Sequence, residues 1–75
     1  MKALIFIKNH FDTLITINNL QLIKTTGLDG APIDITDFNK FSLNNTCGTL
    51  EFIGNNTKLI ARSNEISAVK LTKNN

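Results

Sequence analysis

Residues 3–7 read ALIFI, an apolar run that would need cover on both faces if it formed a strand. Successive side chains of a strand point to opposite faces, so alternate residues from Ala3 to Ile7 share one face and Leu4 and Phe6 share the other. Such a strand is stable only between two layers. The sequence shows no long amphipathic helical pattern that could supply one of them. The run therefore predicts a second sheet layer or a second subunit.

The remaining apolar segments are short, rich in β-branched residues and separated by polar links, which favours strands over helices. Further strands are expected at residues 14–17, 20–23, 33–35, 50–53, 58–62 and 69–72, where 20–23 either continues the strand before it or begins a new one. Residues 9–12 are expected to form a turn, and residues 44–48 a polar loop. Residues 36–43 form either one or two helical turns, capped by Thr36 or Asp37, or another edge strand.

The last third of the chain predicts a three-stranded antiparallel meander with short links, made of residues 50–53, 58–62 and 69–72. The link Gly54-Asn55-Asn56-Thr57 is expected to be a hairpin turn, because glycine and asparagine tolerate the positive φ of tight turns. A phosphate cradle would need more glycines and a following helix, whereas a strand follows here.

The segment from Arg62 through Ser63-Asn64-Glu65 to Ile66 and Val69 resembles the link between the last two strands of small SH3-like and Sm-like barrels. In those barrels one 3₁₀ turn joins the two strands. Ser63 stands where Sm proteins usually have a glycine, and the resemblance is confined to this segment. We expect residues 1–75 to form a single all-β domain, or β with one short helix. The expected architecture is a small five- to six-stranded antiparallel barrel or rolled sheet, SH3-like or Sm-like in general shape.

A domain of 75 residues buries a small core and often gains stability from a partner. Leu20, Ile53 and Ile60 fall off the main alternation and add apolar surface to that of the first strand. We therefore predict a homo-oligomer whose interface includes Leu4, Phe6, Ile53 and Ile60, together with an unidentified protein partner.

The residue types needed for most chemistry are scarce. Cys47 is the one cysteine, which rules out an internal disulfide and the four-ligand Cys/His zinc patterns and points to a reducing compartment. His10 is the one histidine, and with Cys47 and Asp12 it could form a nucleophile set only if the fold brought the three together. The carboxylates between residues 29 and 37 lack the spacing of a calcium loop. We expect no enzyme activity, no cofactor and no metal.

The chain is mildly basic, with a formal net charge of +2. Lys58, Arg62 and Lys70 lie in the last two expected strands, and a shared outer face of Lys58, Ile60 and Arg62 would form a short basic stripe. Barrels that bind nucleic acid pair such stripes with exposed aromatic rings. The aromatic residues here are all phenylalanines, most of which a small core needs. Single-stranded RNA or DNA binding through Lys58, Arg62 and Lys70 is therefore the alternative hypothesis.

The leading hypothesis is a non-catalytic small interaction module that binds protein partners or serves as an oligomeric structural or regulatory subunit. The apolar stretch at the start, residues 3–7, is shorter than the core of a signal peptide and no small-residue cleavage site follows it. No apolar run approaches the roughly 20 residues of a membrane span. We expect a cytoplasmic protein that does not bind membranes.

Overall fold

The computed structural model describes residues 1–8 and 13–73, so the turn expected at residues 9–12 lies outside the described part. The described residues form seven strands and three 3₁₀ turns: β1 (Lys2–Ile7), β2 (Leu14–Ile17), β3 (Leu22–Gly27), β4 (Pro32–Ile35), η1 (Phe38–Lys40), η2 (Leu43–Asn45), β5 (Thr46–Ile53), β6 (Lys58–Arg62), η3 (Ser63–Glu65) and β7 (Ile66–Thr72). The mostly-β class is confirmed. The expectation of five or six strands was too low, because β3 starts a new strand instead of continuing β2, whereas the short strand expected at residues 33–35 is present as β4.

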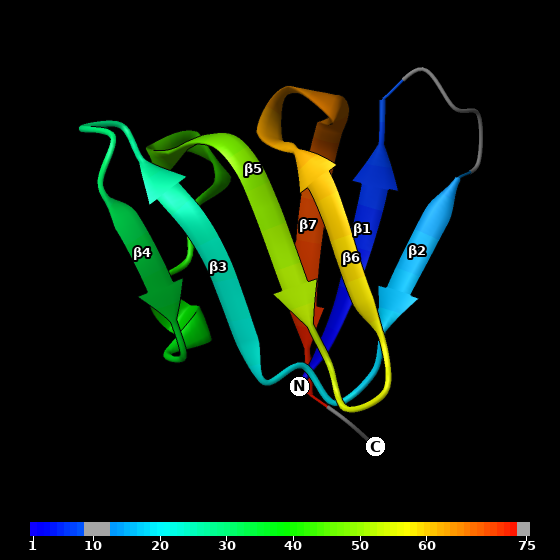
Figure 1. Ribbon diagram of the computed structural model, residues 1–75. Helices are drawn as coiled ribbons and strands as arrows, with labels where there is room; N and C mark the ends of the chain where they lie inside the picture. The colour runs from blue at the N-terminus through cyan, green and yellow to red at the C-terminus, as the bar shows by residue number, and fades with distance from the viewer. Residues whose placement is uncertain (9–12, 74–75) are drawn as a thin grey trace.

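The strands lie in two antiparallel layers (Figure 1). One sheet has three strands in the order β2-β1-β7, and the other has four in the order β4-β3-β5-β6. Each sheet keeps an edge strand on both sides, so the two sheets do not close into a barrel. The second layer covers one face of β1, as the doubly apolar run requires, and leaves the other face pointing outward.

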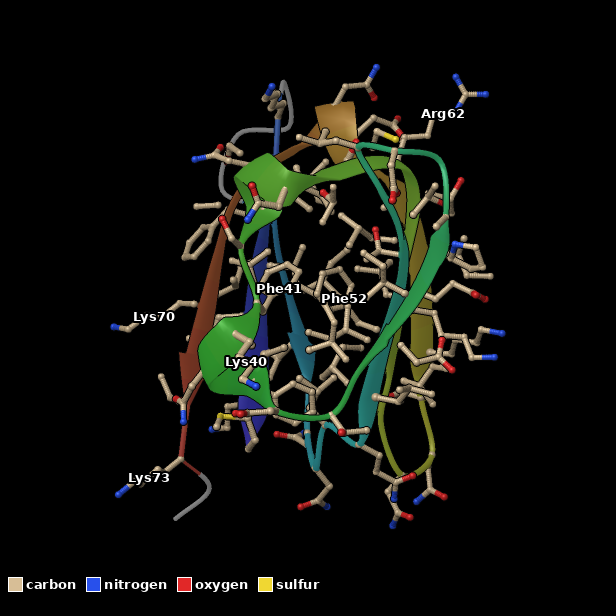
Figure 2. All side chains as sticks on the ribbon, turned by 90° about the vertical axis from the view of Figure 1, so that its left-hand side faces the viewer. Lys40, Phe41, Phe52, Arg62, Lys70 and Lys73 are labelled. Atoms are coloured by element: carbon tan, nitrogen blue, oxygen red, sulfur yellow. The ribbon has the colours of Figure 1, made fainter. Side chains whose placement is uncertain are left out.

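The core lies between the sheets and is built from the inward residues of both. Its buried apolar members are Ala3, Ile5, Ile17, Leu20, Ile23, Leu50, Phe52 and Ile66. Phe52 is fully buried at the centre, and its ring meets that of Phe41 edge-to-face with centroids 6.2 Å apart (Figure 2). The alternation read from residues 3–7 is confirmed, since Ala3 and Ile5 are buried while Phe6 is exposed.

The predicted C-terminal meander is wrong in its last strand. β6 pairs with β5, but β7 leaves that sheet and pairs with β1, with Ile5 opposite Val69 and Ala3 opposite Leu71. The turn η3 redirects the chain between them, and the Glu65 carboxylate accepts a hydrogen bond from the Arg62 N–H at 3.2 Å. The 3₁₀ link expected at residues 63–65 is thus confirmed. Pairing β7 with β1 places Val69 and Leu71 beside Ile5 and Ala3 on the inward face of this sheet, where both pack against the core.

The chain passes from one sheet to the other between β2 and β3. Asn19 takes a left-handed conformation there, with φ of 52°, which asparagine tolerates better than most residues. The Leu20 N–H donates to the Met1 carbonyl and the Gln21 N–H to the Ile53 carbonyl, so this corner is tied to both sheets. Leu20, expected to add surface apolar area, is instead buried in the core.

Residues 36–45 form two 3₁₀ turns, which decides between the helical and the strand alternatives. Asp37 caps η1 by accepting a hydrogen bond from the Asn39 N–H at 3.3 Å. Phe38 and Phe41 pack against the core from this segment. The polar loop expected at residues 44–48 is partly wrong, because β5 already begins at Thr46. Across residues 1–8 and 13–73, no helix has the length and hydropathy needed to cross a membrane.

The Gly54–Thr57 link is a hairpin turn between β5 and β6, closed by the Gly54 N–H donating to the Thr57 carbonyl at 2.8 Å. The sequence analysis explained the glycine of this turn by a positive φ. That explanation is wrong, since Gly54 does not have a positive φ. A Cβ atom on Gly54 would lie 2.6 Å from the Asn18 carbonyl oxygen and 2.7 Å from Cγ2 of Ile17. The glycine is needed because the hairpin touches the corner where the chain changes sheets.

Substituting Gly54 with alanine is therefore expected to destabilise the protein by about 1–3 kcal/mol, because the backbone of the corner must move to admit the methyl group. Urea denaturation followed by circular dichroism measures this change. Asn55→Ala in the same turn is the matched control, and this exposed position should change the stability by less than about 0.5 kcal/mol. Equal stability of the two variants would contradict the close-approach explanation.

Candidate interaction surfaces

The outward face of the three-stranded sheet carries two of the predicted interface residues, Leu4 and Phe6. Both lie on β1, and the register places Leu14 of β2 and Ala68 of β7 on either side of Phe6. Phe6 is 38% exposed and Leu14 is 47% exposed, while Leu4 is half-buried. Cross-strand partners touch on the same face of a sheet, so these four side chains form one apolar patch. We call these residues the β1 patch.

Leu14 and Ala68 of the β1 patch were not predicted from the sequence to belong to an interaction surface. The alternation of residues 14–17 does separate Leu14 from Ile15 and Ile17, which face inward. The pairing of β2 with β1 in this register, and of β7 with β1 at all, was not predicted. Only that pairing brings Leu14 and Ala68 beside Phe6.

The charged strand residues on the outward face of this sheet are lysines. Lys70 lies opposite Leu4 on the same outward face, and Lys2 lies two residues from Leu4 along β1. Thr16 and Thr72 also lie on this face, and the hydroxyl of the exposed Ser67 donates a hydrogen bond to the Phe6 carbonyl at 3.1 Å. Among the strand residues, the patch is therefore apolar at its centre with a polar, basic margin, an arrangement typical of interaction sites.

The outward face of the four-stranded sheet carries the other two predicted interface residues, Ile53 and Ile60. Ile53 lies opposite Lys58 and is half-buried, whereas Ile60 lies opposite Glu51 and is 57% exposed. This face is mixed in charge, and the Lys58 ammonium contacts the Glu51 carboxylate at 2.9 Å. The four predicted residues thus fall on two opposite surfaces rather than on one.

The three cations of the nucleic-acid hypothesis do not share a surface. Lys58 and Arg62 lie with Ile60 on the outward face of β6, as the alternation predicted, but Lys70 belongs to the other sheet. Figure 2 shows Arg62 and Lys70 pointing away from opposite sides of the molecule. Lys58 is engaged by the Glu51 carboxylate, so within residues 1–8 and 13–73 Arg62 is the cation of the expected stripe that makes no ion pair.

The residues considered for catalysis cannot be assembled into a described site. Cys47 is half-buried on β5, and its Sγ donates to the Gly27 carbonyl at 3.2 Å. His10 and Asp12 lie outside the described residues. Within residues 1–8 and 13–73, no group of three histidine, cysteine or acidic side chains is placed to hold a metal ion.

Comparison with known proteins adds no relative: no family model, no curated protein and no solved structure matches this chain.

Proposed function

We propose that this protein is a non-catalytic interaction module that works by binding proteins, and that two copies associate through the β1 patch. The observation that carries the proposal is the exposure of the cross-strand pair Phe6 and Leu14 at the centre of an outward sheet face. Isolated apolar side chains are common on protein surfaces, but a contiguous group rimmed by polar residues marks an interaction site.

A two-fold contact would use the β1 patch twice, because each residue of an isologous interface appears on both subunits. Complete burial of a phenylalanine or leucine side chain contributes about 1.5–3 kcal/mol, and both residues start partly buried, so each contributes less than that here. Lys2 and Lys70 would remain at the margin, where they stay hydrated. The association should therefore be driven mainly by apolar surface and respond little to salt.

We propose that residues 1–75 form one domain with the general shape of a small SH3-like or Sm-like barrel, although the two sheets are not closed. The support is local and lies in the 3₁₀ link at residues 63–65 between the last two strands. We place the protein in the cytoplasm, because its one cysteine fits a reducing compartment.

The alternative proposal is binding of single-stranded RNA or DNA on the outward face of β6. It is favoured by the neighbourhood of exposed Ile60 and exposed Arg62 on that face. Such a complex releases counterions, so its affinity falls steeply as salt rises.

Size-exclusion chromatography of untagged protein, with light scattering, refractive index and absorbance at 260 nm, tests both proposals. We expect the mass of two chains of 8.3 kDa each. This mass should be the same in low and high salt, and the peak should show no absorbance from nucleic acid. The chain has no tryptophan or tyrosine, so bound nucleic acid is easily seen. A mass of 8.3 kDa at all concentrations would contradict self-association. Absorbance that follows the protein and is lost in high salt would support nucleic-acid binding instead.

A further inference from the structure

The outward face of the three-stranded sheet carries positive charge that the sheet itself does not match. Lys2 lies opposite Thr72, and Lys70 lies opposite Leu4 and points away from the molecule (Figure 2). In the described part of the chain neither lysine makes an ion pair, and β1, β2 and β7 contain no acidic residue. Glu65 precedes β7, and its carboxylate accepts a hydrogen bond within its own turn. The two lysines are therefore left without a carboxylate partner.

The outward face of the four-stranded sheet is different, because both of its lysines have carboxylates on the same face. Lys24 lies opposite Asp34 on β4 and opposite Glu51 on β5. The Glu51 carboxylate also contacts the Lys58 ammonium at 2.9 Å. In the described strands of this sheet, Arg62 is the cation that faces no carboxylate. Unmatched charges of one sign favour a partner of the opposite sign, so the lysines of the three-stranded sheet favour an acidic partner.

These two lysines lie beside the β1 patch. Lys2, Leu4 and Phe6 alternate along β1 on one face, and the register places Lys70 next to Leu4. A strand advances about 3.3 Å per residue, so Leu4 is about 7 Å and Lys2 about 13 Å from Phe6 along the strand. In an extended segment laid over the patch, these distances correspond to about two and four residues. A ligand that covers Phe6 can therefore reach both ammonium groups with nearby carboxylates.

We propose that the β1 patch binds an acidic segment of a partner protein, in which an apolar side chain covers Phe6 and Leu14 and carboxylates two to four residues away pair with Lys2 and Lys70. This inference rests on the proposed function, because it names the chemistry of the protein that the module binds. A second copy of this chain covers the same patch but presents only its own lysines to these lysines. The acidic segment gains charge pairs that the dimer lacks, so it competes with self-association.

The composition of the patch favours a protein over a nucleic acid. Single-stranded nucleic acids stack their bases on aromatic rings, and Phe6 is the one ring in the described strands of this sheet. Its neighbours on the patch are the aliphatic side chains Leu4, Leu14 and Ala68. These strands also contain no arginine, the residue best suited to phosphate and base recognition. An apolar side chain is the better fit to this surface.

The probe is a phage-displayed library of random dodecapeptides, selected on the full chain and counter-selected on the Phe6→Ala variant. Counter-selection keeps the peptides that need Phe6 and does not itself favour any charge. We expect the enriched peptides to share an apolar residue with aspartate or glutamate two to four positions away. Enrichment of neutral or basic peptides, or of none, would overturn the inference.

Two double variants separate the position of the charges from their number. Lys2→Gln/Lys70→Gln removes two positive charges beside the patch, and Lys24→Gln/Lys58→Gln removes two from the outward face of the other sheet. Calorimetric titration of a synthesised acidic peptide should show binding about three- to tenfold weaker for the first variant, because exposed charge pairs are individually modest. The second variant should bind within about 1.5-fold of the wild type. Equal losses in the two variants would overturn the inference.

The same titrations test the charge pairs directly from the side of the peptide. Replacing its acidic residues with glutamine should weaken binding to the wild type about three- to tenfold, and binding to Lys2→Gln/Lys70→Gln by less than about 1.5-fold. Raising the salt concentration should weaken the acidic peptide and leave the glutamine peptide nearly unchanged. An equal effect of the glutamine replacement on both proteins would overturn the pairing with these lysines.

Light scattering separates this inference from self-association. Without peptide the mass reports self-association alone, and saturating acidic peptide should lower it to that of one chain with one peptide. A protein that is monomeric without peptide but binds the acidic peptides would contradict self-association only. A dimer whose mass the peptides do not change would overturn this inference only. Binding of a ten-nucleotide oligothymidylate that is lost in Lys2→Gln/Lys70→Gln, with no acidic peptide enriched, would overturn it in favour of nucleic acid.

Discussion

Replacing Phe6 with glutamate is expected to convert the protein from an oligomer to a monomer of 8.3 kDa. Phe6 lies at the centre of the β1 patch and is 38% exposed, so the fold can accept a carboxylate at this position while the interface cannot. A two-fold contact would bury two such charges opposite each other without partners. Light scattering over a hundredfold range of protein concentration measures the mass, and circular dichroism shows whether the variant is folded.

Ile60→Glu is the matched control for this substitution. It makes the same apolar-to-acidic change on the outward face of the four-stranded sheet, at a side chain that is 57% exposed. We expect it to keep the mass of the wild type. If Ile60→Glu dissociates the oligomer and Phe6→Glu does not, the contact surface is the other sheet. If both variants keep the wild-type mass and melting temperature, self-association through either predicted group is wrong.

Replacing Phe52 with alanine is expected to remove most of the free energy of unfolding at 25 °C. Phe52 is fully buried at the centre of the core and packs edge-to-face on Phe41, so truncation removes an aromatic pair and leaves a void. Phenylalanine-to-alanine changes in cores cost about 3–5 kcal/mol. A domain of this size has a free energy of unfolding near the lower end of about 5–15 kcal/mol.

Thermal and urea denaturation followed by circular dichroism give the loss for Phe52→Ala. Leu28→Ala is the control, since Leu28 is an exposed residue between β3 and β4 and should change the stability by less than about 0.5 kcal/mol. A Phe52→Ala variant within about 1 kcal/mol of the wild type would show that the core repacks around the void.

The local structure was largely readable from the sequence. The alternation in residues 3–7, and of Leu59 and Ala61 with their neighbours, correctly gave the inward and outward faces of β1 and β6, because a strand has a fixed period of two. The turn at residues 54–57 was also found, since glycine and asparagine mark turns. The 3₁₀ link at residues 63–65 followed from the resemblance of this segment to the link in small SH3-like and Sm-like barrels.

The sequence by itself determined that this chain forms strands, which side chains of β1 and β6 point inward, and that one face of the first strand is left for another layer. Only the tertiary structure decided that β7 pairs with β1, that Leu14 and Ala68 join Phe6, and that Lys70 lies apart from Arg62. It also showed that Gly54 is required by a contact with Asn18 and not by its own φ. The physical reason is range: side-chain alternation and turn preference act between neighbours along the chain, whereas strand order, edges and cavities depend on contacts between distant residues.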